Sequence, residues 1–216
     1  MKSYKKTVII TTLITLLPIL AGVILWSRLP DKIPMHWNFS GEADGWSGKS
    51  FAVFGFPCIL AVIHLIAVLV TFNDPKRKNI HKKPLTFVVW LTPVLSVLLN
   101  GVTYAIALGA DIDMSVIVFL LVGIFFILIG NYMPKLQQNY TVGIKIPWTL
   151  NSVENWNRTH RLGGKLFIVG GFVIIVNGFI GGFAGETLSL AVMIAVVVLC
   201  AVIPMGYSFW LFHRGI

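Results

Sequence analysis

Residues 7–26 read TVIITTLITLLPILAGVILW, an apolar segment that contains no charged side chain. A helix needs about 20 apolar residues to cross the hydrocarbon core of a bilayer, so this segment is long enough to span one. It is also longer than the apolar part of a usual secretory signal peptide. Lys2, Lys5 and Lys6 precede it, but no convincing small-x-small cleavage site follows it. We therefore predict an uncleaved first membrane helix.

The composition of the rest of the chain agrees with a membrane protein. Of its 216 residues, 56% are hydrophobic and only 12% are charged, whereas a soluble domain carries about 25% charged residues. Five further apolar segments of spanning length lie at residues 51–72, 85–108, 115–132, 165–183 and 188–212. We predict an all-α integral membrane bundle of six transmembrane helices. It divides into an N-terminal membrane half, residues 1–108, and a C-terminal membrane half, residues 109–216.

The Lys and Arg residues fall mostly on one side of this bundle. If the N-terminus is cytoplasmic, 14 of the 17 Lys and Arg residues lie on the cytoplasmic side, and only Arg28, Lys32 and Lys49 lie outside. Positive charge gathers in the cytoplasmic loops of membrane proteins, so both termini are predicted to be cytoplasmic. The net charge of +9 is then explained by basic residues that set the topology and contact anionic membrane lipids. No direct binding of nucleic acid is expected. The cytoplasmic set is Lys2, Lys5, Lys6, Lys76, Arg77, Lys78, Lys82, Lys83, Lys135, Lys145, Arg158, Arg161, Lys165 and Arg214.

Two loops are long enough to carry a function. The external loop, residues 27–50, contains LPDKIPMHWNFSGEADGWSGK at residues 29–49. Its prolines favour an extended chain and its glycines supply turns. His36, Glu42 and Asp44 are its titratable side chains apart from the flanking charges. One histidine and two acids in a loop are a weak signal for a metal, so we predict an ordered cap on the helix ends, without metal or cofactor.

The cytoplasmic loop, residues 133–164, is predicted to contain a short amphipathic helix before the fifth span. Asn151 can cap this helix, with Glu154 three positions on as in a capping box. The helix is expected to turn through Gly163–Gly164 into the span. Its two interpretations are an interfacial anchor, which the physics favours, and a docking face for a cytoplasmic partner. One face carries Val153, Trp156 and His160.

The spans contain a few polar groups and many glycines. Polar groups that face lipid are costly, so His64, Asn100, Asn131 and Asn177 are expected to face the bundle interior. A neutral His64, hydrogen-bonded to a neighbouring helix, is the expected state. Close helix contacts are expected at the glycine positions. These are Gly170, Gly171, Gly178, Gly181 and Gly182.

A tripeptide occurs once in each half of the chain. Lys-Ile-Pro stands at residues 32–34 and again at residues 145–147. A three-plus-three inverted repeat would place such copies on opposite faces of the membrane, as in many transporters. This pattern motivates an alternative function, a carrier of small molecules or lipids.

The cytoplasmic loop also carries a long motif. Residues 130–165 read GNYMPKLQQNYTVGIKIPWTLNSVENWNRTHRLGGK. This sequence resembles the signature of the SdpI family of immunity proteins, with its Gly-Asn-x-Met-Pro, Gly-Ile-Lys-x-Pro-Trp-Thr-Leu and Trp-x-x-Thr-His-Arg-x-Gly-Gly elements. Lys145 stands where Arg is common in the family. The external loop resembles the conserved element of a small bacterial membrane domain of unassigned biochemical role.

The resemblance implies a protein of the bacterial plasma membrane that gives resistance to a secreted killing peptide, an SdpC-type toxin. It also implies a receptor that holds a cytoplasmic autorepressor at the membrane. No enzyme activity is expected, because the chain has no His-Glu-x-x-His, no Gly-x-Ser-x-Gly and no paired acids inside its spans. The candidates to face the toxin are His36, Trp37, Asn38, Glu42, Asp44 and Trp46. The candidates to face the cytoplasmic repressor are Lys145, Pro147, Trp148, Trp156, Thr159, His160 and Arg161.

Overall fold

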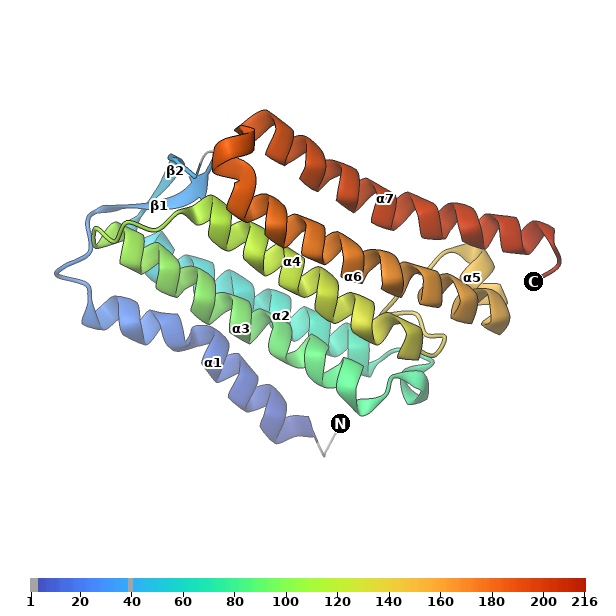
Figure 1. Ribbon diagram of the computed structural model, residues 1–216. Helices are drawn as coiled ribbons and strands as arrows, with labels where there is room; N and C mark the ends of the chain where they lie inside the picture. The colour runs from blue at the N-terminus through green and yellow to red at the C-terminus, as the bar shows by residue number, and fades with distance from the viewer. Residues whose placement is uncertain (1–3, 39–40) are drawn as a thin grey trace. The chain divides into compact units, whose positions relative to one another are not determined.

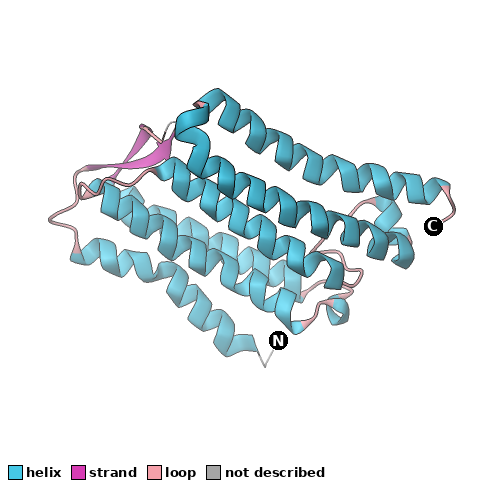
Figure 2. Cartoon of the chain, in the orientation of Figure 1, coloured by secondary structure: helices cyan, strands magenta, loops and turns pink. Residues whose placement is uncertain are grey.

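The computed structural model describes residues 4–38 and 41–216, apart from the side chains of residues 182–184 and 186. Lys2, which the charge count above includes, lies outside the described residues. Helices dominate the described chain, and one two-stranded hairpin joins the first two spans (Figures 1 and 2). The helices are α1 (Lys5–Ile24), α2 (Phe56–Phe72), α3 (Lys82–Ala107), α4 (Met114–Tyr132), α5 (Pro147–Asn151), α6 (Val153–Ala184) and α7 (Glu186–His213), and the strands are β1 (Lys32–Trp37) and β2 (Ala43–Gly48).

Six helices of the described chain are long and apolar enough to cross a membrane. This confirms the predicted all-α membrane bundle. The spans α1, α2, α3, α4 and α7 agree with the predicted segments within a few residues. The second span includes a π-helical turn, Phe51–Gly55, ahead of α2.

The predicted turn at Gly163–Gly164 is wrong, because α6 runs without interruption from Val153 to Ala184. The helix that was predicted before the fifth span is the first part of α6. Its cap is Ser152 and not Asn151, since Ser152 Oγ accepts a hydrogen bond from the Asn155 backbone N–H at 3.2 Å. Asn151 is the last residue of the short helix α5. Glycines usually weaken a helix. Here they face close neighbours, since a Cβ on Gly164 would lie 2.8 Å from the Gly130 carbonyl oxygen.

The chain forms two compact units. The first unit comprises residues 1–73 and 82–113, and so contains α1, α2, α3 and the hairpin. The second unit comprises residues 74–81 and 114–216, with α4 to α7. The short loop between α2 and α3 therefore packs with the second unit, although both helices that it joins belong to the first.

Polar side chains connect the three helices of the first unit through its interior. Thr11 Oγ1 lies 3.0 Å from His64 Nε2, which links α1 to α2. Ser96 Oγ donates to the Thr15 carbonyl oxygen at 2.7 Å, which links α3 to α1, and Asn100 Nδ2 donates to the Ser96 carbonyl at 2.8 Å. All five side chains are buried. His64 and Asn100 thus lie inside the bundle, as polar groups in an apolar medium should.

Glycines set the contact between α4 and α6 in the second unit, where the two helices lie side by side (Figure 1). A Cβ on Gly171 of α6 would lie 2.5 Å from the Gly123 carbonyl oxygen of α4. The same relation holds one heptad away, where a Cβ on Gly130 would lie 2.7 Å from the Gly164 carbonyl oxygen. Small residues at a regular interval let two backbones approach closely, which is a main source of helix association in membranes.

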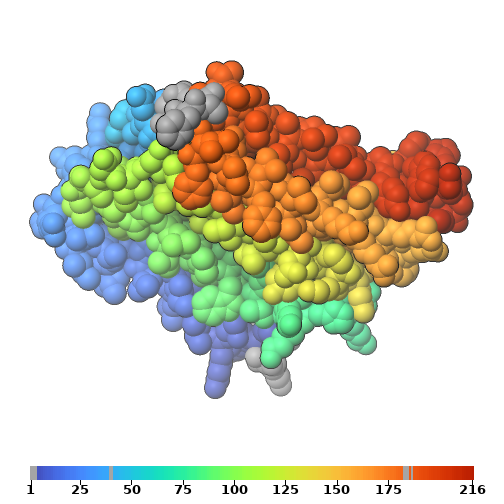
Figure 3. All heavy atoms as spheres, in the orientation of Figure 1, coloured from blue at the N-terminus to red at the C-terminus, as the bar shows by residue number. Residues whose placement is uncertain are grey.

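The helix α7 packs on the other side of α6. Asn177 Nδ2 of α6 donates to the Ser189 carbonyl of α7 at 2.8 Å, and Gly170 faces Val196 and Cys200. Figure 3 shows the residues of α7, in red, against the first turns of α6, in orange. Asn177 is therefore buried as expected. Asn131 is not, because it is exposed as the second-last residue of α4, where its amide can reach the membrane surface.

Candidate functional site

The hairpin of β1 and β2 is anchored on the first unit by its base. Ile33 is fully buried in a cluster with Leu29, Ala52, Val53 and Tyr104. The strands pair antiparallel, with Pro34 opposite Trp46 and His36 opposite Gly45. The register shifts next to His36, so the strands bend where the polar end of the hairpin begins. This arrangement holds the end of the hairpin on a rigid base.

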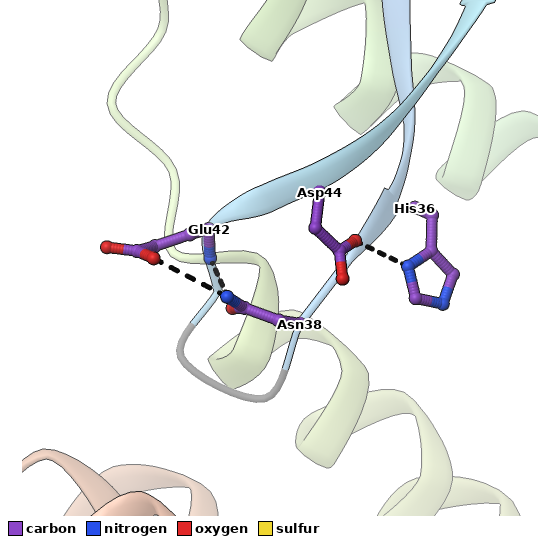
Figure 4. Close-up of polar contacts among 4 residues, drawn as sticks. All are labelled: His36, Asn38, Glu42 and Asp44. Carbon is purple, nitrogen blue, oxygen red and sulfur yellow. Dashed lines mark hydrogen bonds and ion pairs between the residues drawn. The ribbon is translucent and has the colours of Figure 1, made fainter.

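Two side-chain pairs occupy the polar end of the hairpin (Figure 4). His36 Nδ1 lies 2.5 Å from Asp44 Oδ1. Asn38 Oδ1 accepts a hydrogen bond from the Glu42 backbone N–H at 3.0 Å, and Asn38 Nδ2 donates to Glu42 Oε2 at 3.4 Å. Glu42 therefore pairs with Asn38 and not with His36. Among the described residues, no three His, Cys, Asp or Glu side chains come close enough to hold a metal ion.

Aromatic and charged side chains line the hairpin base. Lys49 Nζ lies 3.3 Å from Asp31 Oδ1, donates to the Trp26 carbonyl at 3.2 Å and stands over the Trp26 ring. Trp26 and Trp46 are 38% and 57% exposed. Rings of this kind suit the boundary between lipid and water. The hairpin thus presents an open surface that is both aromatic and polar.

In the second unit, residues 133–164 pack around Trp156. They comprise the connection after α4, the short helix α5 and the first turns of α6, and are called the signature loop below. The Trp156 side chain is fully buried, and its Nε1 donates to the Leu136 carbonyl at 2.7 Å. The His160 ring stacks on it with the ring centroids 4.0 Å apart. Gly143 passes against this pair with φ +123°, and a Cβ there would lie 2.5 Å from His160 Nε2. Only glycine fits that position without strain.

The hydrogen bonds of His160 determine its protonation state. The Ile144 backbone N–H, which can only donate, lies 2.9 Å from Nε2. The Trp156 carbonyl oxygen, which can only accept, lies 2.8 Å from Nδ1. Nε2 must therefore be free of a proton and Nδ1 must carry one, so the ring is neutral. In this state His160 fastens the loop at residue 144 to α6.

The loop between α2 and α3 packs on the signature loop. Asp74 Oδ2 accepts hydrogen bonds from the Tyr140 backbone N–H at 2.9 Å and from Thr141 Oγ1 at 2.5 Å. Asn79 Nδ2 donates to the Gln138 carbonyl at 2.7 Å. Asp74 is buried, so its carboxylate depends on these partners. The segment 74–81 therefore works as a clamp on the signature loop.

Two family models match the chain, one in each of its two compact units. The model of the SdpI/YfhL protein family matches residues 135–208, and that of a domain of unknown function, DUF1648, matches residues 13–61. The Immunity protein SdpI of Bacillus subtilis (strain 168) is 33% identical over 210 residues, which is 97% of each chain. The chain belongs to the SdpI family. No solved structure matches it significantly.

Membership of the SdpI family, together with the six apolar helices, makes the chain a multi-pass protein of the bacterial cell membrane. The DUF1648 match ends within α2 and includes the whole hairpin. The SdpI match begins in the signature loop and ends in α7. The external loop thus lies wholly within the DUF1648 match, and the signature loop lies mostly within the SdpI match.

The structure corrects the predicted partner-facing surface of the SdpI signature. Trp156, Thr159 and His160 are fully buried within the second unit, so their side chains do not face a partner. Aromatic and polar residues on one helical face mark internal packing here. Trp148 is half-buried, with its ring centroid 4.9 Å from that of Phe209 of α7. The exposed members of the predicted set are Lys145, Pro147 and Arg161.

Several residues of the site were missed by sequence reasoning. Asp74 and Gln138 join the clamp to the signature loop, and Gln138 Nε2 also donates to the Thr149 and Leu150 carbonyls. Asn155 is fully buried and receives a hydrogen bond from Ser208 Oγ at 2.6 Å. A signal for Asn155 was its place one residue before Trp156 in the motif. The sequence contained no signal for Asp74, because this residue adjoins the basic segment 76–83, which was explained by its effect on topology alone.

Replacing Asp74 by asparagine tests the clamp. The change puts an N–H donor where a carboxylate oxygen now accepts hydrogen bonds, so we expect a local loss of about 1–3 kcal/mol. Amide hydrogen exchange at residues 138–142 should become faster. The matched control is Asp31→Asn, because the Asp31 side chain is fully exposed in the first unit. Unchanged exchange in the Asp74 variant would contradict the clamp.

Proposed function

We propose that this chain is an immunity protein. It gives its host resistance to a secreted killing peptide of the SdpC type and also signals across the membrane by holding a cytoplasmic autorepressor. The observation that carries this proposal is the 33% identity to Immunity protein SdpI across 97% of both chains, which includes both loops. The role is not enzymatic.

The order of the spans supports a location of the two loops on opposite sides of the membrane. The hairpin connects the first and second spans, whereas the signature loop connects the fourth and fifth. Three crossings separate them, and an odd number of crossings reverses the side of the membrane. With both termini in the cytoplasm, as the positive charges favour, the hairpin is external and the signature loop is cytoplasmic.

The hairpin has the properties of a peptide-binding surface. The exposed Trp46 of β2 pairs with Pro34 of β1 in the register of the hairpin. The His36 and Asp44 side chains are 74% and 45% exposed. Tryptophan often supplies most of the energy of a binding surface, and polar side chains around it set the orientation. We propose that the killing peptide contacts this surface, with Trp37, Asn38 and Glu42 at its edge.

The exposed part of the signature loop is basic. Lys145, Pro147 and Arg161 are exposed, whereas Trp156 and His160 hold the loop from inside. We propose that the cytoplasmic repressor binds the exposed residues and reads the conformation of the loop. The clamp offers a route for the signal, because residues 74–81 are continuous with α2 and α3 of the unit that carries the hairpin.

A resistance assay tests the proposed function. The full chain is expressed in a strain that is sensitive to an SdpC-type killing peptide and lacks its own immunity protein. We expect growth at peptide concentrations that stop the empty-vector strain. Full sensitivity, with the protein present in the membrane fraction at normal level, would overturn the proposal.

Within the same assay, Trp46→Ala is expected to lower the half-inhibitory concentration of the peptide about tenfold, because a central contact residue contributes about 1–2 kcal/mol or more. The control is Trp210→Ala, which removes a ring of similar exposure from α7. Membrane levels of both variants are measured by immunoblot. Equal protection by the two variants would remove the hairpin from the toxin-binding surface.

The repeated tripeptide does not support the alternative function, a carrier built on an inverted repeat. Lys32, Ile33 and Pro34 lie in strand β1. In the second copy, Ile146 is extended and Pro147 begins helix α5. The two copies therefore have different local structures, and the immunity function remains our proposal.

A further inference from the structure

An apolar groove lies between the first turns of α1 and the last turns of α2, within the first unit. Its volume is about 480 Å³, which is within the range of about 300–1,000 Å³ that is common for ligand pockets. Val8 and Ile9 form the α1 wall, and Leu65, Val68 and Leu69 form the α2 wall. At one end the rings of Tyr4 and Phe72 stand with their centroids 5.4 Å apart.

The walls of the groove fit hydrocarbon. A stable water in a cavity needs two to four polar partners, and the five wall residues named above have aliphatic side chains. Val68 is buried, whereas Ile9 and Leu69 are about half exposed, so the groove opens toward the surroundings of the helix pair. Both helices are membrane spans, so those surroundings are acyl chains.

The end of the groove near the start of α1 is positively charged. Lys5 lines the groove and Lys6 follows it in the first turn of α1, where there is no acidic residue. The N-cap residue Tyr4 makes no side-chain hydrogen bond to the free N–H groups of that turn. The helix dipole adds to the attraction for a negative group at this place. The start of the first span is also the level at which lipid headgroups lie.

We propose that this groove binds an anionic glycerophospholipid. One acyl chain lies between α1 and α2, and the headgroup phosphate lies at Lys5 and Lys6. Basic residues beside spans are recognised by anionic headgroups, and here they stand at the mouth of a groove that fits the chain of the same molecule. The residues that line this groove belong neither to the hairpin nor to the signature loop, so the test does not depend on the proposed immunity function.

The test is native mass spectrometry of the full chain, released from detergent with either phosphatidylglycerol or phosphatidylcholine of identical acyl chains. We expect the wild type to retain one phosphatidylglycerol in preference to phosphatidylcholine. In the double variant Lys5→Gln, Lys6→Gln, the ratio of bound phosphatidylglycerol to bound phosphatidylcholine should fall about fivefold for each lysine removed. Leu65→Phe, which fills the groove, should lower the binding of both lipids.

Two matched controls separate the groove from general surface attraction. Lys82→Gln with Lys83→Gln removes the same charge from the start of α3, and Val70→Phe adds the same ring to an exposed position of α2 outside the groove. Both should retain the wild-type preference. An equal loss in the two lysine pairs would overturn the proposal. So would stronger lipid binding after deletion of residues 2 and 3, because the chain's own N-terminus would then be the occupant of the groove.

Discussion

Replacing Gly171 by leucine is expected to lower the free energy of unfolding by about 3 kcal/mol, the upper end of the usual range for an overpacked contact. A Cβ at this position would lie 2.5 Å from the Gly123 carbonyl oxygen, which is backbone of the neighbouring helix and cannot swing aside. The helices α4 and α6 would have to separate. The measurement is thermal unfolding of the purified protein in detergent, followed by the loss of monodisperse protein.

The matched control is Gly206→Leu in α7. A Cβ at Gly206 meets no atom within 4 Å. Leucine also favours helix over glycine by nearly 1 kcal/mol. This variant should therefore be as stable as the wild type or slightly more stable. If both variants unfold at the wild-type temperature, the close α4–α6 contact does not hold the second unit together.

Replacing Trp156 by alanine is expected to cost about 3–5 kcal/mol, the usual loss for a large aromatic side chain removed from a core. The change empties a fully buried position, removes the partner of the Leu136 carbonyl and takes away the ring on which His160 stacks. Hydrogen exchange at residues 136–144 should rise sharply. Binding of the proposed repressor should fall because the loop loses its shape.

Arg161→Ala serves as the contrast, because Arg161 is exposed on the same helix. A surface change of this kind alters stability by less than about 0.5 kcal/mol. We expect normal thermal unfolding and normal exchange of the loop, with weaker binding of the proposed repressor. The opposite pattern, with a stable Trp156 variant and an unfolded Arg161 variant, would contradict the division into inner and surface residues.

The spans could be predicted from the sequence because transfer into a bilayer depends on local apolar length. Residues 51–72, for example, lie within one apolar run and agree with the observed second span. The continuous α6 could not be predicted, because each glycine weakens a helix by about 1 kcal/mol relative to alanine and the pair at 163 and 164 therefore favoured a turn. The helix continues here because both glycines have close neighbours, with Gly130 of α4 against Gly164 and Ile144 against Gly163. Such contacts are not visible in the local sequence.

The parts of the site that depend on distant contacts were also beyond the sequence. Asp74 meets Thr141 across 67 residues, and no periodicity links the two positions. His36 and Asp44 are eight positions apart, and they pair because the register of the hairpin sets His36 opposite Gly45, the neighbour of Asp44. The burial of Trp156 was not predicted by either interpretation of its helix, an interfacial anchor or a docking face, because an apolar helical face can pack equally well on the membrane, on a partner or on its own protein.

Labelling of single cysteines in intact cells tests most directly whether the hairpin and the signature loop lie on opposite sides of the membrane. Cys58 and Cys200 are first replaced by alanine. Lys32→Cys then reports on the hairpin and Lys145→Cys on the signature loop, and both positions are exposed. With a membrane-impermeant maleimide, we predict that the cysteine at position 32 reacts in intact cells and that the cysteine at position 145 reacts only after permeabilisation. Reaction of both cysteines in intact cells would contradict the account.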